Sequence, residues 1–519
     1  MKRLKLEVYL NHFVVHVYDR KLWDIVTSFS KSLVSYKFEF NRRFKRMTRV
    51  PDKMYCIVHE AKGTVRYPIS LLKQMLSTLG YHYAIKLDNI EIIDYSKIET
   101  GLPADLQFND KKYELYDYQE KYVAELSKNK CDVRMVDLLM ALGKTVIFAA
   151  AACRIGKKIG VIILPKYIEK WLEDFADLIP STKGRVYVAQ GSEGLLSLMN
   201  NPEEAKAKYD IFIFPMRTLY NYISVYADDQ TERYSNSPYP IPPDKLMQAL
   251  GIGTVLSDEC HQEFYSLYRA MMYFKVDKFI ALSATLEHND KHMQYIYDSL
   301  IPPGVRVSKL VEYEPYIRTY AVKYEIANVQ KIPCIRSQGY SHIMFEQYAM
   351  ANTYFLKQYV DMIMHYVEEG YIARRKKGDK LLIFISTVDM CKHIKEVLNK
   401  KYAKLDVRTY VQEDEYENII DADIITSTIV SSGTAITIPN LITTIMTIPV
   451  GSSQANNQSF GRLRRLKGKE TRFYYLYASN FDKHRDLSRK REEAIKDKSL
   501  SYTYLRYTPS PTQPELLLK

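Results

Sequence analysis

The stretch that decides the fold is VRMVDLLMALGKT, residues 133–145. Its first part, Val133–Leu138, is a short β-rich apolar run, which is typical of a strand buried on both faces of a parallel sheet. Its second part, Met140–Thr145, leads into a helix that we expect to begin near Val146. Backbone N–H groups at the N-terminus of such a helix surround phosphates. The stretch therefore predicts a phosphate-binding loop.

The residues of this loop indicate a nucleotide triphosphate with a magnesium ion. Lys144 would place its charge against the β- and γ-phosphates, and the Thr145 hydroxyl would ligate Mg²⁺. The backbone of Ala141, Leu142 and Gly143 would surround the phosphates. The loop is a weak signal by itself, because Gly-Lys-Thr also occurs by chance and the first glycine of the usual pattern is absent.

Similar apolar runs recur along the chain and alternate with helical stretches, which predicts parallel sheets flanked by helices. The first series of runs is Val133–Leu138, Val161–Leu164, Ile211–Phe214, Thr254–Ser257 and Phe279–Leu282. The second series is Leu381–Ile385, Val407–Val411, Ile424–Thr426, Thr443–Ile448 and Arg472–Leu476. We expect an α/β fold with two doubly wound parallel-sheet lobes in tandem.

The two series also suggest boundaries. We assign residues 106–305 to the first lobe and 306–480 to the second, with Pro302-Pro303-Gly304 at the break. Residues 481–519 are expected to form a basic helix and a tail. Residues 1–105 are interpreted as a small α+β domain. Its expected strands are Leu4–Leu10, Phe13–Tyr18, Tyr36–Phe40 and Tyr81–Asp88, and its expected helices are Leu22–Leu33 and Ser70–Leu79, the latter ended by Gly80.

One segment of the N-terminal domain mixes cations with aromatic residues. Within Tyr36–Arg49, basic residues that include Arg42, Arg43 and Arg46 alternate with aromatic rings. Such a pattern suits phosphate contacts with nearby base stacking. A solvated strand face over an aromatic core explains it equally well.

The composition limits the class of protein. Hydrophobic residues make up 46% and charged residues 26%, as in globular proteins, which argues against disorder and coiled coil. The chain has 74 Lys and Arg against 61 Asp and Glu, a net charge of +13 that favours nucleic acid as a partner. The six cysteines show no zinc-ligand spacing, and no apolar run approaches the length of a membrane span. We expect a cytoplasmic protein without zinc or membrane contact.

Two further polar motifs follow predicted strands of the first lobe. Asp258 and Glu259 come directly after Thr254–Ser257, where carboxylates can meet a ligand at the end of a parallel sheet. Asp258 would ligate Mg²⁺, and Glu259 would orient and deprotonate an attacking water. Ser283 and Thr285 follow the next strand and could relay position between the nucleotide and a bound strand.

A cluster of arginines lies late in the second lobe, in the sequence Gln458-Ser-Phe-Gly-Arg462-Leu-Arg-Arg465. Arginines that face a triphosphate stabilise the charge that develops in the transition state. The same cluster could instead be a phosphate patch for nucleic acid.

The phosphate loop, DECH, SAT and QxxGRxxR occur in this order, each after a predicted strand, and together they resemble superfamily 2 helicases and translocases. Within the superfamily, the aromatic-basic N-terminal segment and the pairing of DECH with a short GRxxR are most similar to phage UvsW-type branch-migration helicases. The resemblance implies two RecA-like lobes, with ATP and Mg²⁺ bound at the first.

The resemblance also assigns roles to matching residues. It implies that Tyr118, Gln119 and Gln458 contact the nucleotide, that Arg462 and Arg465 are arginine fingers, and that His261, Ser283 and Thr285 couple the nucleotide to movement. The nucleic-acid contacts it implies are Pro165, Lys166, Arg217, Thr218, Gly433 and Thr437, to which we add Arg42, Arg43 and Arg46 from the N-terminal segment.

The expected activity is ATP-dependent remodelling of duplex, forked or branched DNA in replication, recombination or repair, in contact with proteins of those processes and in a host cytoplasm if the chain is phage-encoded. Three alternatives stay open: an RNA helicase, the motor subunit of a restriction or defence complex, and a nucleic-acid-binding protein with a decayed ATP site. ATPase stimulation by matched DNA and RNA separates the first of these from the DNA motor.

Overall fold

The computed structural model describes the chain except for residues 1–2, 42, 44–45, 84, 86–88, 138–142, 228–236, 261–262, 284–289, 309, 311–312, 327–328, 337–338, 412–413, 416, 430–437 and 509–519. The chain divides into two compact units. Unit 1 comprises residues 1–138 and 142–311, and unit 2 comprises residues 139–141 and 312–519.

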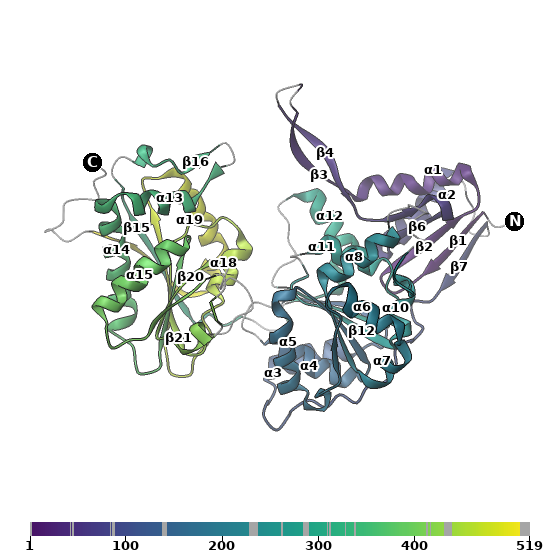
Figure 1. Cartoon of the computed structure of the whole chain (residues 1–519). Helices are drawn as coiled ribbons and strands as arrows, with labels where there is room; N and C mark the ends of the chain where they lie inside the picture. The colour runs from purple at the N-terminus through teal and green to yellow at the C-terminus, as the bar shows by residue number, and fades with distance from the viewer. Residues whose placement is uncertain are drawn as a thin grey trace. The chain divides into compact units, whose positions relative to one another are not determined.

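Unit 1 begins with a five-stranded sheet in the order β5-β6-β2-β1-β7 (Figure 1, purple). Its strands are β1 Leu4–Val8, β2 His12–Val17, β5 Ile57–His59, β6 Thr64–Pro68 and β7 Ile90–Asp94. Alternate residues of β1 are buried, so one face of the sheet covers a core. Two helices accompany the sheet: α1 Arg20–Ser28, which continues as a 3₁₀ turn to Leu33, and α2 Leu72–Tyr83.

The strand predicted at Tyr81–Asp88 is wrong. Helix α2 passes through Gly80 and ends at Tyr83, and the strand of this region is β7, which pairs parallel to β1. A Cβ at Gly80 would meet no atom within 4 Å, so the packing does not require a glycine or a helix end there. Tyr81 and Tyr83 alternate with other residues as the apolar residues of a strand do, and this pattern led to the wrong prediction. Tyr81 is in fact 89% exposed near the end of the helix.

A separate two-stranded hairpin projects from this region (Figure 1). It consists of β3 Val34–Asn41 and β4 Arg46–Met54, paired antiparallel. The predicted strand Tyr36–Phe40 lies within β3, whereas β4 was not predicted. Its charged and proline-containing sequence, RMTRVPDKM, has no apolar alternation by which to recognise it.

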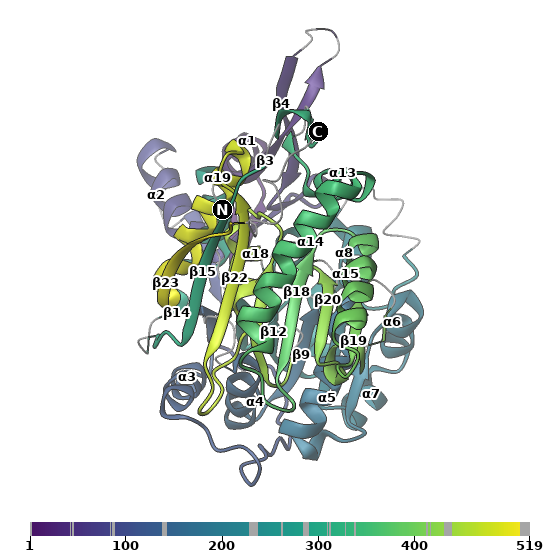
Figure 2. The same ribbon diagram turned by 90° about the vertical axis from the view of Figure 1, so that its left-hand side faces the viewer.

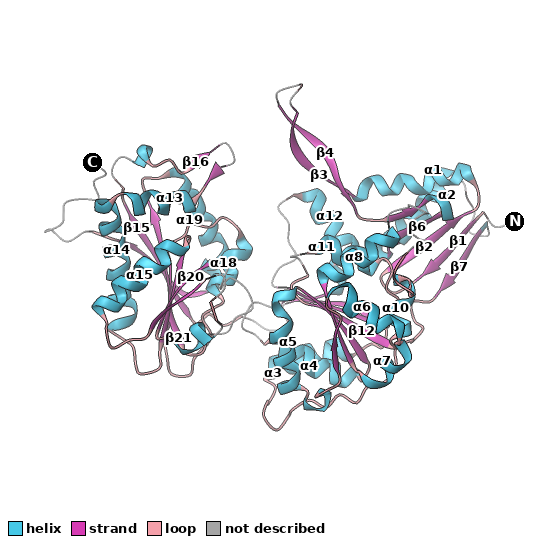
Figure 3. Cartoon of the chain, viewed as in Figure 1, coloured by secondary structure: helices cyan, strands magenta, loops and turns pink. Residues whose placement is uncertain are grey.

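The rest of unit 1 is a parallel sheet flanked by helices (Figure 3, magenta and cyan). The sheet has seven strands in the order β10-β11-β9-β12-β13-β8-β14. The strands are β8 Asp132–Asp137, β9 Lys158–Ile163, β10 Val186–Val188, β11 Ile211–Pro215, β12 Ile252–Ser257, β13 Lys278–Ser283 and β14 Arg306–Ser308. The helices are α3 Asp117–Ser127, α4 Lys144–Ile155, α5 Ile168–Leu178, α6 Gly191–Asn200, α7 Pro202–Lys208, α8 Met216–Ala227, α10 Pro243–Ala249, α11 Phe264–Met271 and α12 Lys291–Leu300.

The strand order explains how the helices cover both faces. The chain moves in one direction along the sheet from β8 to β9 to β10 and then returns through β11, β12, β13 and β14. Because parallel crossovers are right-handed, opposite directions put their helices on opposite faces. Helices α4 and α5 therefore cover one face and α8, α10 and α11 the other, which makes the lobe doubly wound.

Unit 2 holds a second seven-stranded parallel sheet in the order β19-β20-β18-β21-β22-β15-β23 (Figure 2). The strands are β15 Ile317–Tyr324, β18 Lys380–Ile385, β19 Val407–Tyr410, β20 Ile424–Thr428, β21 Leu441–Met446, β22 Thr471–Ala478 and β23 Ser499–Arg506. The helices include α13 His342–Ala351, α14 Thr353–Val367, α15 Val388–Lys401, α16 Glu417–Asp421, α18 Ser453–Phe460 and α19 Asp482–Ile495; β16 Ile335–Arg336 and β17 Gly339–Tyr340 form a small ladder.

The strands predicted for the two lobes are all present, with their ends shifted by a few residues. Strands β9, β12, β13, β18 and β21 are buried along their whole length, as their apolar runs predict. Strands β10, β14, β15 and β23 were missed, and the tail expected after helix α19 instead begins with β23. The predicted fold class, two doubly wound parallel-sheet lobes of RecA-like type preceded by a small α+β region, is confirmed.

One apolar core runs through the N-terminal sheet and the first lobe, so these two parts of unit 1 pack as one body. Two further clusters, which lie in unit 2, pack its sheet and helices. Among the helices that the structure describes, none combines the length and apolar character that a membrane crossing requires.

Candidate active site

The predicted phosphate loop ends at the N-terminus of α4, which follows strand β8 in the chain. Gly143 is the N-cap residue and has a left-handed backbone, with φ at +77°. Lys144 and Thr145 form the first turn of the helix, whose residues Ile147–Ala152 are buried against the sheet. The helix N-terminus is thereby held at the edge of the sheet with its N–H groups free of helical partners. Ala141 and Leu142 lie outside the described residues.

Gln119 of helix α3 packs directly on this loop. Its side-chain Oε1 accepts a hydrogen bond from the backbone N–H of Tyr116 at 3.0 Å, and the residue is 5% exposed. A Cβ at Gly143 would lie 2.5 Å from Nε2 of Gln119, so the amide occupies the space beside the glycine. Tyr116 and Tyr118, which precede Gln119 in the chain, stack on each other with their ring centroids 5.7 Å apart. The structure thus brings the predicted nucleotide contacts Gln119 and Gly143 together.

The two acidic residues of DECH lie at the end of β12, as predicted. Asp258 Oδ1 accepts from the backbone N–H of Glu259 at 2.9 Å, and its Oδ2 accepts from Trp171 Nε1 at 3.1 Å. Glu259 has a left-handed backbone, with φ at +47°, and is 9% exposed. A positive φ is uncommon for a residue with a Cβ and marks a tight turn at functional sites.

The electrostatics show that Lys144 lies close to these carboxyl groups. Burial, together with the negative charge of Glu259, raises the pKa of Asp258 to about 6, although the positive charge of Lys144 lowers it. Burial likewise raises the pKa of the Cys260 thiol to about 12, where Lys144 and a hydrogen bond with Ser283 act in the opposite direction. Lys144, Asp258, Glu259, Cys260 and Ser283 therefore form one group, which we call the strand-end cluster.

The topology explains why these residues meet. Strands β8, β13 and β12 are neighbours in the sheet, so their carboxyl ends lie at one edge. The backbone N–H of Cys260 donates to the carbonyl of Leu282 at 3.3 Å and ties the DECH turn to β13. His261 and Thr285, the other predicted coupling residues, lie outside the described residues.

The carboxylate of Asp258 and the hydroxyl of Thr145, which follows Lys144 in the first turn of α4, fit a magnesium ion that is bound together with phosphates. Mg²⁺ in such sites takes one or two carboxylates, with the remaining ligands from phosphate oxygens and water. Asp258 supplies a carboxylate and Thr145 a hydroxyl. Among the residues that the structure describes, no group of three His, Cys, Asp or Glu side chains could hold a metal ion, so an all-protein metal site is not found there.

Four predicted nucleic-acid contacts lie at the ends of neighbouring strands of the first lobe. Pro165 and Lys166 follow β9 and are exposed, and Arg217 follows β11 and is exposed. Thr218 is buried, and its Oγ1 accepts a hydrogen bond from the backbone N–H of Gly191 at 3.1 Å. Because β9 lies between β11 and β12, these residues share the sheet edge with the strand-end cluster.

In unit 2 the predicted arginine fingers have different environments. Arg462 is 3% exposed and lies near Tyr410, whose phenol pKa is raised by burial and lowered by the Arg462 charge. Arg465 is exposed, forms an ion pair with Glu314 at 2.9 Å and lies over the ring of Tyr316 at 5.6 Å. Gln458 is buried in helix α18. Gly433 and Thr437 lie outside the described residues.

On the β3–β4 hairpin, Arg43 and Arg46 are exposed, while Arg42 lies outside the described residues. They belong to unit 1 but are far along the chain from the strand-end cluster.

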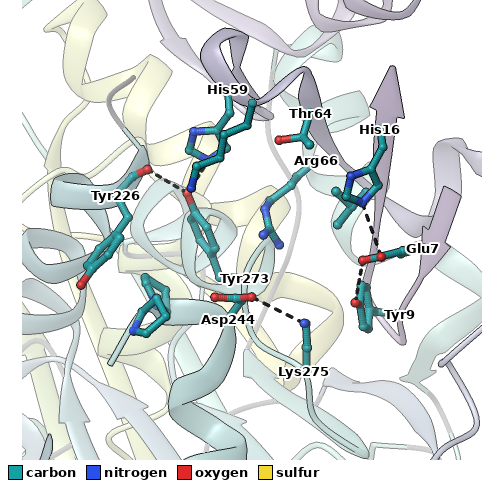
Figure 4. Close-up of a pocket in the computed structure, with 14 residues that line it drawn as sticks. Glu7, Tyr9, His16, His59, Thr64, Arg66, Tyr226, Asp244, Tyr273 and Lys275 are labelled. Carbon is teal, nitrogen blue, oxygen red and sulfur yellow. Dashed lines mark hydrogen bonds and ion pairs between the residues drawn. The ribbon is translucent and has the colours of Figure 1, made fainter. Parts of the chain in front are cut away.

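A pocket of about 500 Å³ lies away from the strand-end cluster, at the seam between the N-terminal sheet and the first lobe (Figure 4). Its charges are largely paired within it: Lys275 lies 3.6 Å from Asp244, and His16 lies 3.5 Å from Glu7. Arg66 donates to the backbone carbonyl of Met272 and lies 4.6 Å from the centre of the Tyr273 ring. This pattern is typical of a polar joint between two packed elements.

Sequence reasoning missed two buried residues that hold the ends of central strands in place. Trp171 on α5 is 2% exposed and fixes Asp258. Glu346 on α13 is fully buried and accepts hydrogen bonds from the backbone N–H groups of Ser386 and Thr387, which directly follow β18. For Trp171 the spacing of α5 predicts burial only; nothing near Glu346 in the sequence indicates its partner.

A scan of family models finds no match to the chain, and neither does a search of curated proteins. Among solved structures, the chain is similar to T4 UvsW, at 14% identity and a TM-score of 0.36 over 97% of this chain and 99% of that one. It is also similar to Mss116p bound to ssRNA and AMP-PNP, at 16% identity and a TM-score of 0.48 over 79% and 82% of the two chains. A third is the Hef helicase domain of Pyrococcus furiosus, at 14% identity and a TM-score of 0.41 over 72% and 98%.

Proposed function

We propose that the chain is an ATP-driven helicase or translocase that remodels branched or duplex DNA, by fork regression or junction branch migration. The observation that carries the ATPase is the strand-end cluster: a cation, two carboxyl groups and a helix N-terminus at one edge of a parallel sheet. Open α/β sheets bind ligands at that edge. The DNA substrate is supported by the basic composition, the exposed cations of the hairpin and the motif resemblance.

In the proposed chemistry, the N–H groups of α4 and the Lys144 ammonium bind the β- and γ-phosphates of ATP. Thr145 and Asp258 would hold Mg²⁺, which would neutralise charge on the phosphates when bound. Glu259 orients the attacking water and takes its proton. Burial at this turn excludes bulk water and so strengthens each of these interactions. Gln119 and Tyr118 hold the adenine.

The remaining predicted residues are assigned to coupling and grip. Ser283 contacts the DECH turn through Cys260, so a change at the γ-phosphate can pass to β13. Pro165, Lys166, Arg217 and Thr218 would contact the DNA backbone at the same sheet edge. The other proposed roles are coupling for His261 and Thr285, nucleotide contact for Ala141, Leu142 and Gln458, transition-state charge for Arg462 and Arg465, and DNA contact for Gly433, Thr437, Arg42, Arg43 and Arg46.

We further propose four functional parts: a DNA-binding domain at 1–105, an ATP-binding lobe at 106–305, an arginine-finger lobe at 306–480 and a basic helix and tail at 481–519. Closing of the two lobes upon ATP binding and reopening after hydrolysis would step the motor along DNA.

The test is steady-state ATPase activity of the wild type and Lys144→Ala, each without nucleic acid and with duplex DNA, single-stranded DNA, a four-way junction and RNA. Loss of the Lys144 charge removes an interaction that strengthens in the transition state, so turnover should fall about 100-fold or more. The matched control is Lys128→Ala, an exposed lysine at the end of α3.

Stimulation by junction DNA that disappears in Lys144→Ala and persists in Lys128→Ala supports a branched-DNA motor. Stronger stimulation by RNA would replace DNA with RNA as the substrate. An ATPase that stays silent with every nucleic acid would contradict the motor and leave the chain as a binding protein or a subunit that needs a partner.

A further inference from the structure

The β3–β4 hairpin has two chemically different faces. Directly opposed residues of an antiparallel pair share a face, and the pairs are Tyr36 with Pro51, Phe38 with Arg49 and Phe40 with Met47. These six residues form what we call the aromatic face. The opposite face carries Lys37, Glu39 and Thr48 among others.

The aromatic face is open to solvent. Phe38 is 68% exposed, Phe40 59%, Met47 56% and Tyr36 41%. In the part of the chain that the structure describes, β3 and β4 pair only with each other, and they project beyond the body of unit 1 (Figures 1 and 2). Neighbouring apolar side chains that are exposed to this degree mark an interaction site rather than a core.

The charges on the opposite face of the hairpin are paired within the hairpin itself. On the opposite face, Lys37 lies 2.8 Å from Glu39 and 3.7 Å from Asp52, so the charges there are balanced within the hairpin. Thr48 Oγ1 donates to the carbonyl of Glu39 at 3.3 Å. These polar side chains of the hairpin therefore have partners within the hairpin, and the exposed apolar side chains lie on its other face.

The root of the hairpin is fixed to the first lobe. His292 on α12 lies 2.7 Å from the carbonyl oxygen of Val34 through its Nε2, and its ring lies 5.9 Å from that of Tyr36. Lys53 lies over the ring of Tyr265 on α11 at 5.0 Å. Helix α12 is the next helix after β13, whose last residue is Ser283. The hairpin is thus an arm anchored on the element that follows the strand-end cluster.

The chemistry of the aromatic face favours nucleic-acid bases over an apolar protein surface. The guanidinium of Arg49 lies 4.0 Å from the centre of the Tyr36 ring, so the aromatic face itself contains a cation. Two more exposed cations lie near the tip of the hairpin: Arg43 in the turn, and Arg46, which pairs with Asn41 at the end of the opposite face. Flat rings bordered by cations suit unstacked bases and their phosphates, and base–aromatic stacking needs no sequence preference.

We infer that the aromatic face stacks unpaired bases where duplex DNA opens into single strands, so that the hairpin is the element that recognises the branch point. This inference rests on the proposed function, because it needs a nucleic-acid substrate. Phe38 and Phe40 are the stacking residues, and Arg43, Arg46 and Arg49 neutralise the adjoining phosphates.

The test compares binding of a fork with two single-stranded arms and of a blunt duplex, each measured over a range of salt concentrations. In Phe38→Ser/Phe40→Ser, the preference for fork over duplex should fall about tenfold or more, while the salt dependence of fork binding keeps its slope. In Arg43→Ala/Arg46→Ala, the slope itself should flatten. The control is Tyr81→Ser, an aromatic residue 89% exposed on α2 of the same unit, which should behave as wild type.

A direct readout uses a fork with 5-iodouracil at the first unpaired positions. Irradiation should cross-link that base to Phe38 or Phe40, as mapped by mass spectrometry, and not to Tyr81. Melting of each variant by circular dichroism checks that the fold persists. Cross-links that map outside the hairpin, together with an unchanged fork preference, would overturn the inference.

The outcomes separate the inference from the proposed function. If wild-type ATPase is stimulated by forks but the double-Phe variant keeps its fork preference, the aromatic face is not the branch-point element and the motor still stands. If the wild type binds no nucleic acid, the motor itself fails. If sedimentation shows a wild-type dimer that the double-Phe variant dissolves, the face binds a second copy of the chain, which also overturns the inference.

Discussion

Gly143, the N-cap residue of α4, has a left-handed backbone at the end of the predicted phosphate loop. Its φ of +77° is costly for any residue with a Cβ, and an added Cβ would lie 2.5 Å from Nε2 of Gln119. In Gly143→Ala, either the loop or Gln119 must therefore move. We expect ATP affinity to fall at least tenfold and the free energy of unfolding to fall by about 1–2 kcal/mol, measured by nucleotide titration and by urea unfolding.

The matched control lies at the other end of the same helix. Gly156 has a similar φ of +64°, but the nearest atom to its added Cβ is the carbonyl oxygen of Cys153 at 3.9 Å. Gly156→Ala should thus lose similar stability while it keeps its ATP affinity. Equal loss of ATP affinity in both variants would mean that backbone strain in α4, rather than contact between Gly143 and Gln119, governs the site.

At the scale of residues, the sequence allows the site residues to be predicted, but not the buried residues that contact them. Lys144, Asp258 and Glu259 were predicted as site residues from their residue types, their positions after strands and the order of the motifs, and the structure brings the three together. The hydrogen bond from Trp171 to Asp258 joins residues far apart in the chain, and no local pattern encodes it. Buried partners of this kind depend on how the lobe folds around its sheet.

At the scale of elements, burial decides which strands can be predicted. Strands such as β12 and β18 are covered on both faces and appear in the sequence as continuous apolar runs. Strand β23 mixes intermediate and exposed positions at the sheet edge, and β15 contains Arg318 and Lys323. Their polar residues conceal them from a search for apolar runs, although both complete the second sheet.

The contact between β2 and the end of α11 joins the N-terminal sheet to the first lobe. Asn11, next to the start of β2, donates from Nδ2 to the carbonyl of Met271 at 2.6 Å, and its Oδ1 lies 3.2 Å from His12 Nδ1. Burial holds the pKa of His12 well below its usual range, and the positive charges of Arg66 and Lys275 lower it further. His12 is therefore neutral in the folded protein.

Because His12 is buried and neutral at this contact, we expect unit 1 to be less stable in acid. Below pH 6.5 the unfolded chain binds a proton at His12 that the folded chain does not, so stability falls as the pH falls. Between pH 7.5 and 5.5 the wild type should lose about 1.4 kcal/mol more than His12→Gln. Urea unfolding followed by tryptophan fluorescence measures this in unit 1, because both tryptophans, Trp23 and Trp171, lie there.

The comparison uses the change with pH in each protein, so a constant stability difference between the wild type and His12→Gln does not affect it. Parallel pH dependence in the two proteins would show that His12 takes up its proton without unfolding the joint, contrary to the burial argument.

At the scale of the whole molecule, the proposed motor divides its chemistry between two units. The two series of apolar runs along the chain were enough to predict two α/β lobes, because the runs are the buried strands of the two sheets. The sequence does not encode that Arg465 has a partner within unit 2, the carboxylate of Glu314. In the proposed cycle Arg465 must exchange this carboxylate for the γ-phosphate.

Arg465→Ala should therefore lower DNA-stimulated turnover of ATP at least about tenfold with little change in ATP affinity, because the arginine acts in the transition state. Arg465→Lys should not restore turnover, since an ammonium lacks the planar fork of the guanidinium. Glu314→Gln should retain turnover, because it removes only the competing carboxylate. The matched control is Arg485→Ala: Arg485 is an exposed arginine of the same unit, paired with Asp482 as Arg465 is with Glu314. Single-turnover hydrolysis and nucleotide titration distinguish these effects, and full turnover in Arg465→Ala would remove Arg465 from the proposed site.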